Sequence, residues 1–229
     1  MRFGLQKLTL LDYPGSVACT VFSCGCNFRC PFCHNASLVT GSEAGLELDF
    51  AGLLAFLEKR IGILDGVCFT GGEFLLHPDA VDAVSAAKAL GYRVKVDTNG
   101  SFPQALKELI DAGSVDYIAM DIKNSQEKYA LTCGRDDLLG AVEASVDLLL
   151  HGSVDFEFRT TVTGNLHKVE DFSAIGKWIR GAERYFLQPF EQSDDILVPD
   201  GEYAVDSAML AQALVAVREY VPNAAIRGR

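Results

Sequence analysis

The sequence lacks any long apolar segment. No uninterrupted apolar run in its 229 residues approaches the roughly 20 residues that a membrane-spanning helix needs. The first seven residues carry charge, but no long apolar stretch follows them as it would in a secretory signal. We therefore expect a cytoplasmic protein that does not bind a membrane.

Positive charge is also scarce. The 20 Lys and Arg residues face 31 Asp and Glu residues, which gives a net charge of -11. Such a surface does not neutralise phosphates, so nucleic acid is excluded as a partner and a protein or a small molecule fits better. The hydrophobic fraction of 49% supplies one well-buried core, so we expect a single domain over residues 1–229.

The seven cysteines do not suggest a disulfide framework. Their number is odd, most of them precede position 34, and this usage favours metal binding in a reducing compartment. Cys26, Cys30 and Cys33 have the spacing C-x3-C-x2-C and directly follow the apolar run 17–22. Thiolates so close in sequence usually share a metal, and three protein ligands leave one position open for a reaction.

Zinc and iron–sulfur sites both fit a cysteine-rich loop. Cys24 or His34 could complete a tetrahedral zinc site in a non-catalytic module. Cys24 is poorly spaced from Cys26 for one ion, however, and the chain has no second pair of cysteines with the spacing C-x2-C outside the loop. An iron–sulfur cluster with one open iron fits better.

Apolar runs alternate with helical patterns along the chain, which predicts parallel strands joined by crossover helices. The expected strands are 17–22, 66–70, 93–97, 115–121, 155–162 and 185–188. The expected helices are 49–60, 79–90, 103–112, 137–150, 169–179 and 206–220. These six strand–helix units predict an α/β fold, an open or incomplete barrel that binds its ligands at the carboxyl ends of the strands.

Polar groups follow the strands, as this architecture requires. Gly71-Gly72-Glu73 follows the second strand, where paired glycines permit close approach of a ligand and Glu73 can accept from an ammonium group. Residues 97–100 and 121–123 follow the next two strands, and alone they also fit a tight turn and a solvated ion pair. Arg159 shares one face of its strand with Glu157, so it should point inward and needs an anion, either Glu157 or a ligand carboxylate.

Together these residues resemble the radical S-adenosylmethionine enzymes, which share the cysteine loop, the Gly-Gly-Glu motif and a partial (βα)6 TIM-like barrel. Within that superfamily the chain is similar to the activating enzymes of glycyl-radical proteins, most closely to that of the anaerobic ribonucleoside-triphosphate reductase. The similarity is carried by the segments 10–15, 30–35, 96–100, 120–123 and 158–162.

The resemblance implies a role for each motif. Cys26, Cys30 and Cys33 would hold a 4Fe-4S cluster whose fourth iron binds the amino and carboxylate groups of S-adenosylmethionine. The methionine ammonium group would meet Gly71, Gly72 and Glu73. The rest of the cofactor would lie along Phe32, Asp97, Asn99 and Arg159. A monovalent cation at Asp97, Thr98 and Asp121 is a further implication, which competes with the turn interpretation.

The resemblance also implies the reaction. One electron from the reduced cluster would cleave S-adenosylmethionine to methionine and a 5'-deoxyadenosyl radical, which would abstract a hydrogen atom from a glycine of a partner enzyme. The chain has no cysteines for additional clusters, so flavodoxin or ferredoxin would have to supply the electron. A radical enzyme acting on a small molecule, similar to 7-carboxy-7-deazaguanine synthase, is the alternative.

The chain departs from the related sequences at three places. Phe74 replaces a usual proline after Gly-Gly-Glu, and residues 163–165 stand where Val-Pro-Gly is common. Cys24 replaces a usual glutamine and adds a thiol that oxidation could attack.

Overall fold

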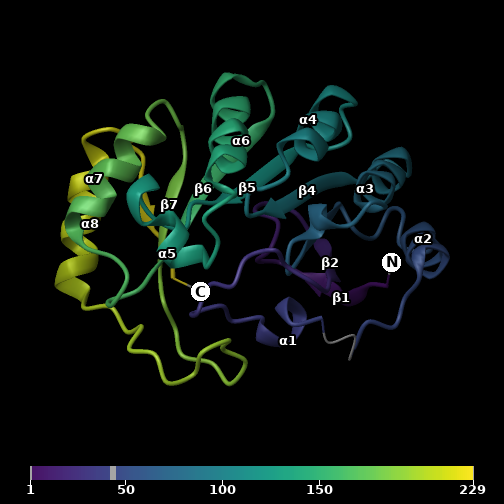
Figure 1. Cartoon of the computed structure of the whole chain (residues 1–229). Helices are drawn as coiled ribbons and strands as arrows, with labels where there is room; N and C mark the ends of the chain where they lie inside the picture. The colour runs from purple at the N-terminus through teal and green to yellow at the C-terminus, as the bar shows by residue number, and fades with distance from the viewer. Residues whose placement is uncertain (1, 42–44, 229) are drawn as a thin grey trace.

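The computed structural model describes residues 2–41 and 45–228, and its centre is one sheet whose strands follow one another in chain order (Figure 1). β1 runs antiparallel to β2, and all later neighbours pair in parallel. The strands are β1 (Gly4–Thr9), β2 (Ala18–Ser23), β3 (Gly66–Gly71), β4 (Arg93–Thr98), β5 (Tyr117–Asp121), β6 (Asp155–Val162), β7 (Tyr185–Pro189) and β8 (Ala225–Ile226).

A helix follows each of the strands β2 to β7, so the six predicted strand–helix units are confirmed. The main helices are α2 (Phe50–Glu58), α3 (Ala80–Ala89), α4 (Pro103–Asp111), α6 (Leu139–His151), α7 (Val169–Trp178) and α8 (Ser207–Arg218). They lie along the outer side of the curved sheet in Figure 1. Among the described residues, no helix has both the length and the apolarity to cross a membrane.

Strand alternation divides the sheet into an apolar outer face and a polar inner face. In β6, Phe158 and Val162 are fully buried beneath the helices, whereas Glu157 and Arg159 point to the inner face. The core therefore lies between the sheet and its helices, and the inside of the partial barrel is left to charged and polar side chains.

Several short elements were not predicted. β1 and the two-residue β8 extend the sheet at its two ends, and β1 is largely exposed, so its apolar pattern is weak. The short helices α1 (Ala36–Val39), η1 (Phe74–Leu76), η2 (Gln126–Lys128) and α5 (Tyr129–Cys133) fall below the length at which a periodic pattern becomes visible.

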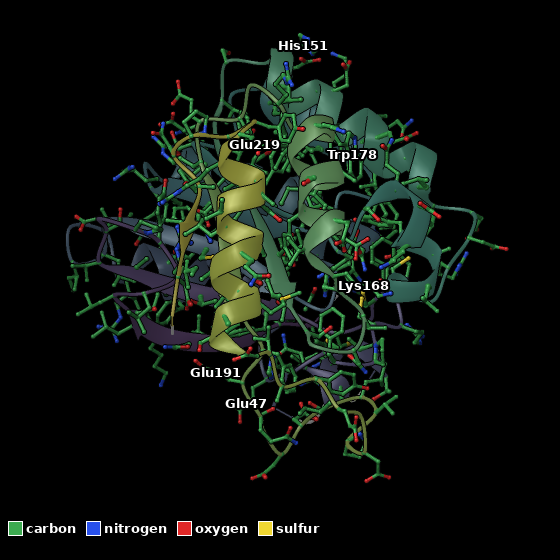
Figure 2. All side chains as sticks on the ribbon, turned by 90° about the vertical axis from the view of Figure 1, so that its left-hand side faces the viewer. Glu47, His151, Lys168, Trp178, Glu191 and Glu219 are labelled. Atoms are coloured by element: carbon green, nitrogen blue, oxygen red, sulfur yellow. The ribbon has the colours of Figure 1, made fainter. Side chains whose placement is uncertain are left out.

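Helices α7 and α8 pack side by side, as Figure 2 shows from the side of Trp178 and Glu219. A glycine permits this approach, because a Cβ atom on Gly176 would lie 2.8 Å from Cδ2 of Tyr220 and 3.1 Å from Cγ2 of Val217. This helix pair covers the last two units of the barrel.

On the inner face of the sheet, Glu157 is paired with a residue that follows β8. Arg227, just after β8, donates two hydrogen bonds to the Glu157 carboxylate at 2.6 and 2.8 Å, and the Tyr117 hydroxyl donates a third. Burial opposes the ionisation of Glu157, but the hydrogen bonds from Arg227 and Tyr117 outweigh it and lower the pKa. Glu157 thus pairs with Arg227 rather than with Arg159.

Arg227→Met should destabilise the fold, because Glu157 is only 1% exposed and would lose its cationic partner. Loss of one member of a buried pair costs about 3–5 kcal/mol, and we expect the lower end at pH 7 because Tyr117 still donates. Urea denaturation measures this loss.

The stabilisation from this pair depends on pH. The lowered pKa of Glu157 makes the stabilisation present above the unfolded value of about 4.3 and lost as the pH falls. The deficit of Arg227→Met should therefore shrink below pH 4, and it should be small at every pH in a Glu157→Gln background. Equal deficits in both backgrounds would contradict this assignment.

Candidate active site

A cavity of about 320 Å3 lies at the carboxyl ends of the parallel strands, where the sequence placed the ligand site. All of the predicted site residues line it: Cys26, Phe32, Cys30, Cys33, Gly71, Gly72, Glu73, Asp97, Thr98, Asn99, Asp121 and Arg159. The structure therefore brings together residues that are up to 133 positions apart in the chain, while their roles toward a ligand remain predictions.

The cysteine loop leaves β2 and is held by main-chain hydrogen bonds on two sides. The amide of Arg29 donates to the carbonyl of Cys133 in α5 at 2.7 Å. On the other side, the amides of Leu197 and Val198 donate to the carbonyls of Cys33 and Pro31 at 3.1 and 2.9 Å. The segment from Asp194 to Asp206, which the sequence alone leaves as either a docking element or a surface loop, thus contacts the loop that carries the thiols through Leu197 and Val198.

The thiols fit a metal cluster by their chemistry and position. Burial raises the pKa of Cys26, and it raises the pKa of Cys30 to about 12, although the nearby Lys123 ammonium group acts in the opposite direction. Thiols so buried ionise when a metal supplies positive charge. Within residues 2–41 and 45–228, no group of three or more Cys, His, Asp or Glu side chains is placed to share a single metal ion. A four-iron cluster separates its thiolates more widely than one ion does, so this finding leaves a cluster site open.

Glycine is required at the end of β3 and directly after it because the backbone there makes close contacts. Gly71 has φ +128°, and a Cβ atom on it would lie 2.2 Å from the Ser23 carbonyl oxygen. A Cβ atom on Gly72 would lie 2.1 Å from the carbonyl oxygen of Gly25. The amides of Gly72 and Glu73 donate to these same two oxygens. Carbonyl groups, rather than amides, are thus the groups of this turn that suit a ligand ammonium.

Glu73 is anchored by the protein itself. Its carboxylate accepts hydrogen bonds from the Leu75 amide at 3.2 Å, the Thr98 hydroxyl at 2.8 Å and the Asn99 amide at 2.6 Å. Burial raises the pKa of Glu73 to about 7, against the effect of these hydrogen bonds. Glu73 therefore joins the ends of β3 and β4, and its contact with a ligand ammonium stays a prediction.

Phe74, the departure after Gly-Gly-Glu, is a core residue. It is fully buried, and its ring lies 4.9 Å from that of Phe69 and 6.2 Å from that of Phe3. The aromatic side chain thus fills space between the turn and the sheet.

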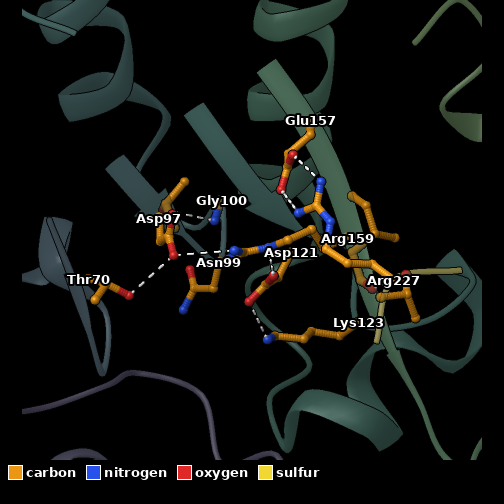
Figure 3. A network of polar contacts seen from close by, with 12 residues as sticks. Thr70, Asp97, Asn99, Gly100, Asp121, Lys123, Glu157, Arg159 and Arg227 are labelled. Atoms are coloured by element: carbon orange, nitrogen blue, oxygen red, sulfur yellow. Dashed lines mark hydrogen bonds and ion pairs between the residues drawn. The ribbon is translucent and has the colours of Figure 1, made fainter. Parts of the chain in front are cut away.

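A network of charged side chains lies on the inner face of the sheet and joins β4, the end of β5 and β6 (Figure 3). Arg159 donates to Asp97 at 3.2 Å and to Asp121 at 3.0 Å, while Lys123 contacts Asp121 at 2.9 Å and Lys95 pairs with Asp97. Burial opposes the ionisation of both aspartates, but the Arg159 guanidinium outweighs it, lowers the pKa of Asp97 and lowers that of Asp121 to about 2.

This arrangement bears on the predicted monovalent cation. The carboxylates of Asp97 and Asp121 contact the guanidinium of Arg159, and the Thr98 hydroxyl donates to Glu73. The protein's own cations thus occupy the carboxylates that were expected to bind a free ion, and the cation site remains a prediction.

Lys123, Gln188 and Asp12 are polar residues of the cavity wall that were not among the predicted site residues. Lys123 was interpreted as part of a solvated pair, yet it lines the cavity. Its position two residues after Asp121 was the available signal, because alternate residues share a face. Gln188 from β7 also lines the cavity, and so does Asp12, which accepts from Thr20 at 2.5 Å. Asp12 lies in the connection between β1 and β2.

The chain is similar to known proteins in sequence and in fold. The family model described as "Radical SAM superfamily" matches residues 20–174. A candidate glycyl-radical enzyme activating enzyme of Methanocaldococcus jannaschii is 32% identical over 83% of this chain and 80% of its own length. The pyruvate formate-lyase-activating enzyme of Clostridium pasteurianum is 29% identical over 82% and 80%. The structure of Streptococcus suis SuiB bound to S-adenosylmethionine has a TM-score of 0.70, 12% identity, and coverage of 90% of this chain and 48% of SuiB.

Glu73→Gln should change how stability depends on pH. Because burial raises the pKa of Glu73 to about 7, the wild type should lose stability as the pH rises from its unfolded value through 7. The glutamine does not titrate, so the variant should gain relative to the wild type between pH 5 and pH 8 in urea denaturation. Glu127→Gln, at an exposed glutamate, is the control. A difference between Glu73→Gln and wild type that is identical at both pH values would refute the raised pKa.

Proposed function

We infer the function of this chain from its family: it belongs to the Radical SAM superfamily, whose enzymes use a 4Fe-4S cluster and S-adenosylmethionine. We propose that it activates a glycyl-radical enzyme. The observation that carries this proposal is that three cysteines at C-x3-C-x2-C spacing line the same cavity as Gly71, Gly72 and Glu73. The names of the two relatives that match four-fifths of the chain support a protein substrate.

Different residues of the cavity would bind the cluster, bind S-adenosylmethionine and exclude water. Cys26, Cys30 and Cys33 would hold the cluster, which with bound S-adenosylmethionine supplies a 5'-deoxyadenosyl radical for hydrogen abstraction from glycine. The Gly71–Gly72 carbonyls would accept from the methionine ammonium group, and Arg159 would face an anionic group of the ligand. Phe28 and Phe32, buried in the cavity wall, would limit the access of water to the radical.

The sequence resemblance supports a more specific proposal for the partner protein. The segments 10–15 and 30–35 favour an anaerobic ribonucleoside-triphosphate reductase as the protein that receives the radical. An external donor such as flavodoxin or ferredoxin would reduce the cluster. The acidic chain, with a net charge of -11, fits a protein partner better than a nucleic acid.

Electron paramagnetic resonance tests this partner directly. The anaerobic enzyme, a reductant and S-adenosylmethionine are mixed with the reductase, and a glycyl-radical doublet is expected on the reductase. Omission of S-adenosylmethionine is the control. Turnover of a small molecule, with no doublet on any glycyl-radical protein, would favour the alternative enzyme that acts on a small molecule.

Cys30→Ala should abolish both cluster binding and cleavage of S-adenosylmethionine, because it removes a buried thiol from the cavity wall. Iron and sulfide analysis and the release of 5'-deoxyadenosine measure the two losses. Cys24→Ala is the matched control from the same segment and should keep both.

Two results would refute the cluster assignment. Wild-type cleavage by Cys30→Ala would show that this thiol is not a ligand. Zinc in place of iron and sulfide after anaerobic purification would support the non-catalytic zinc module instead.

A further inference from the structure

Three polar side chains beside the cysteine loop form a closed ring of hydrogen bonds. Asn99 donates from Nδ2 to Oδ1 of Asn27 at 3.0 Å, and Asn27 donates from Nδ2 to the Ser101 hydroxyl at 2.8 Å. The Ser101 hydroxyl in turn donates to Oδ1 of Asn99 at 2.5 Å. The ring joins the cysteine loop to the end of β4.

The ring has only one consistent orientation at Asn99. The Ser101 backbone amide donates to Oδ1 of Asn99 at 2.9 Å, and a backbone amide can only be a donor. The other end of the Asn99 side chain is therefore the NH2 group. Its second hydrogen points toward the sulfur of Cys26, with Nδ2 and Sγ 3.8 Å apart.

Asn99 is held in this position from the backbone side as well. Its amide donates to Glu73 at 2.6 Å, and Asn99 is only 5% exposed. The hydrogen-bonding capacity of its side chain is thus used by Asn27, Ser101 and Cys26. Another donor, the Phe28 amide, reaches the same sulfur at 3.4 Å.

We propose that the ring of Asn99, Asn27 and Ser101 positions the Asn99 amide as a hydrogen-bond donor to the Cys26 sulfur and thereby raises the reduction potential of the cluster. This inference rests on the proposed function in taking Cys26 as a cluster ligand. Hydrogen bonds to cluster sulfurs stabilise the more negative, reduced state and so set its potential. Asn99 acts through Cys26 and is a positioning residue for the electron transfer that starts the reaction.

The test is a redox titration of the cluster-loaded protein, followed by electron paramagnetic resonance. Asn99→Ala should lower the midpoint potential, with a fall in the equilibrium constant for reduction of up to about tenfold, which is 59 mV for one electron. Asn27→Ala is the matched amide deletion. It keeps the donor to sulfur but opens the ring that positions it, so its potential should fall by clearly less than that of Asn99→Ala. Asn223→Ala, at an exposed asparagine, controls for substitution alone.

Each outcome decides the proposal. An unchanged potential in Asn99→Ala would overturn it. Equal shifts in Asn99→Ala and Asn27→Ala would overturn it too, because they would trace the effect to the shape of the loop. A shifted potential without any glycyl radical on a partner would leave the ring in place and refute the proposed function. A complete cluster in a Cys26→Ala variant would refute both the assignment of Cys26 as a cluster ligand and the proposed role of Asn99.

A second measurement covers the case in which Asn99→Ala does not bind the cluster. Protein is labelled with asparagine that carries 15N only in the side-chain amide, and pulsed electron paramagnetic resonance is recorded on the reduced cluster. A 15N coupling that persists in Asn27→Ala supports the contact between Asn99 and Cys26. The absence of any coupling in the labelled wild type overturns it.

Discussion

The site depends on a backbone contact that is too close for any side chain. The turn Gly71–Gly72 lies against the chain that leaves β2, and the amides of Gly72 and Glu73 donate to the carbonyl oxygens of Ser23 and Gly25 directly before the cysteine loop. This contact sets the place of Cys26 relative to Glu73. Glu73 then extends the connection to the end of β4, so three neighbouring strand ends are fixed in sequence. A reactive centre on loops gains its precision from such connections to rigid strands.

The sequence was sufficient for the architecture because the central strands are buried. Apolar runs and helical periodicity predicted β2 to β7 and the six main helices, whereas β1 and β8 lie at the sheet ends and carry little apolar signal. The gathering of the site residues was predicted by one rule, that ligands bind at the carboxyl ends of parallel strands. That rule follows from topology and does not depend on which side chains touch.

The side-chain contacts within the site could not be predicted from the sequence. Alternation placed Glu157 and Arg159 on the inner face, but it does not say which inward residues are neighbours. Arg159 bridges two aspartates from other strands, and Glu157 receives an arginine 70 positions later. Likewise, the motif did not show that the Glu73 carboxylate binds the end of β4. Pairing partners depend on strand register and side-chain length, and neither is visible in a local motif.

The distribution of charge explains how buried thiols can become ligands in an acidic protein. In the network of β4, β5 and β6, the cations Lys95, Arg159 and Lys123 pair with the carboxylates of Asp97 and Asp121. A buried cation is costly unless an anion lies close to it. Lys123 lies near the cysteines and opposes the rise that burial causes in the pKa of Cys30. The thiolates of a bound cluster are anions near this cation, so Lys123 favours the ionised cysteines.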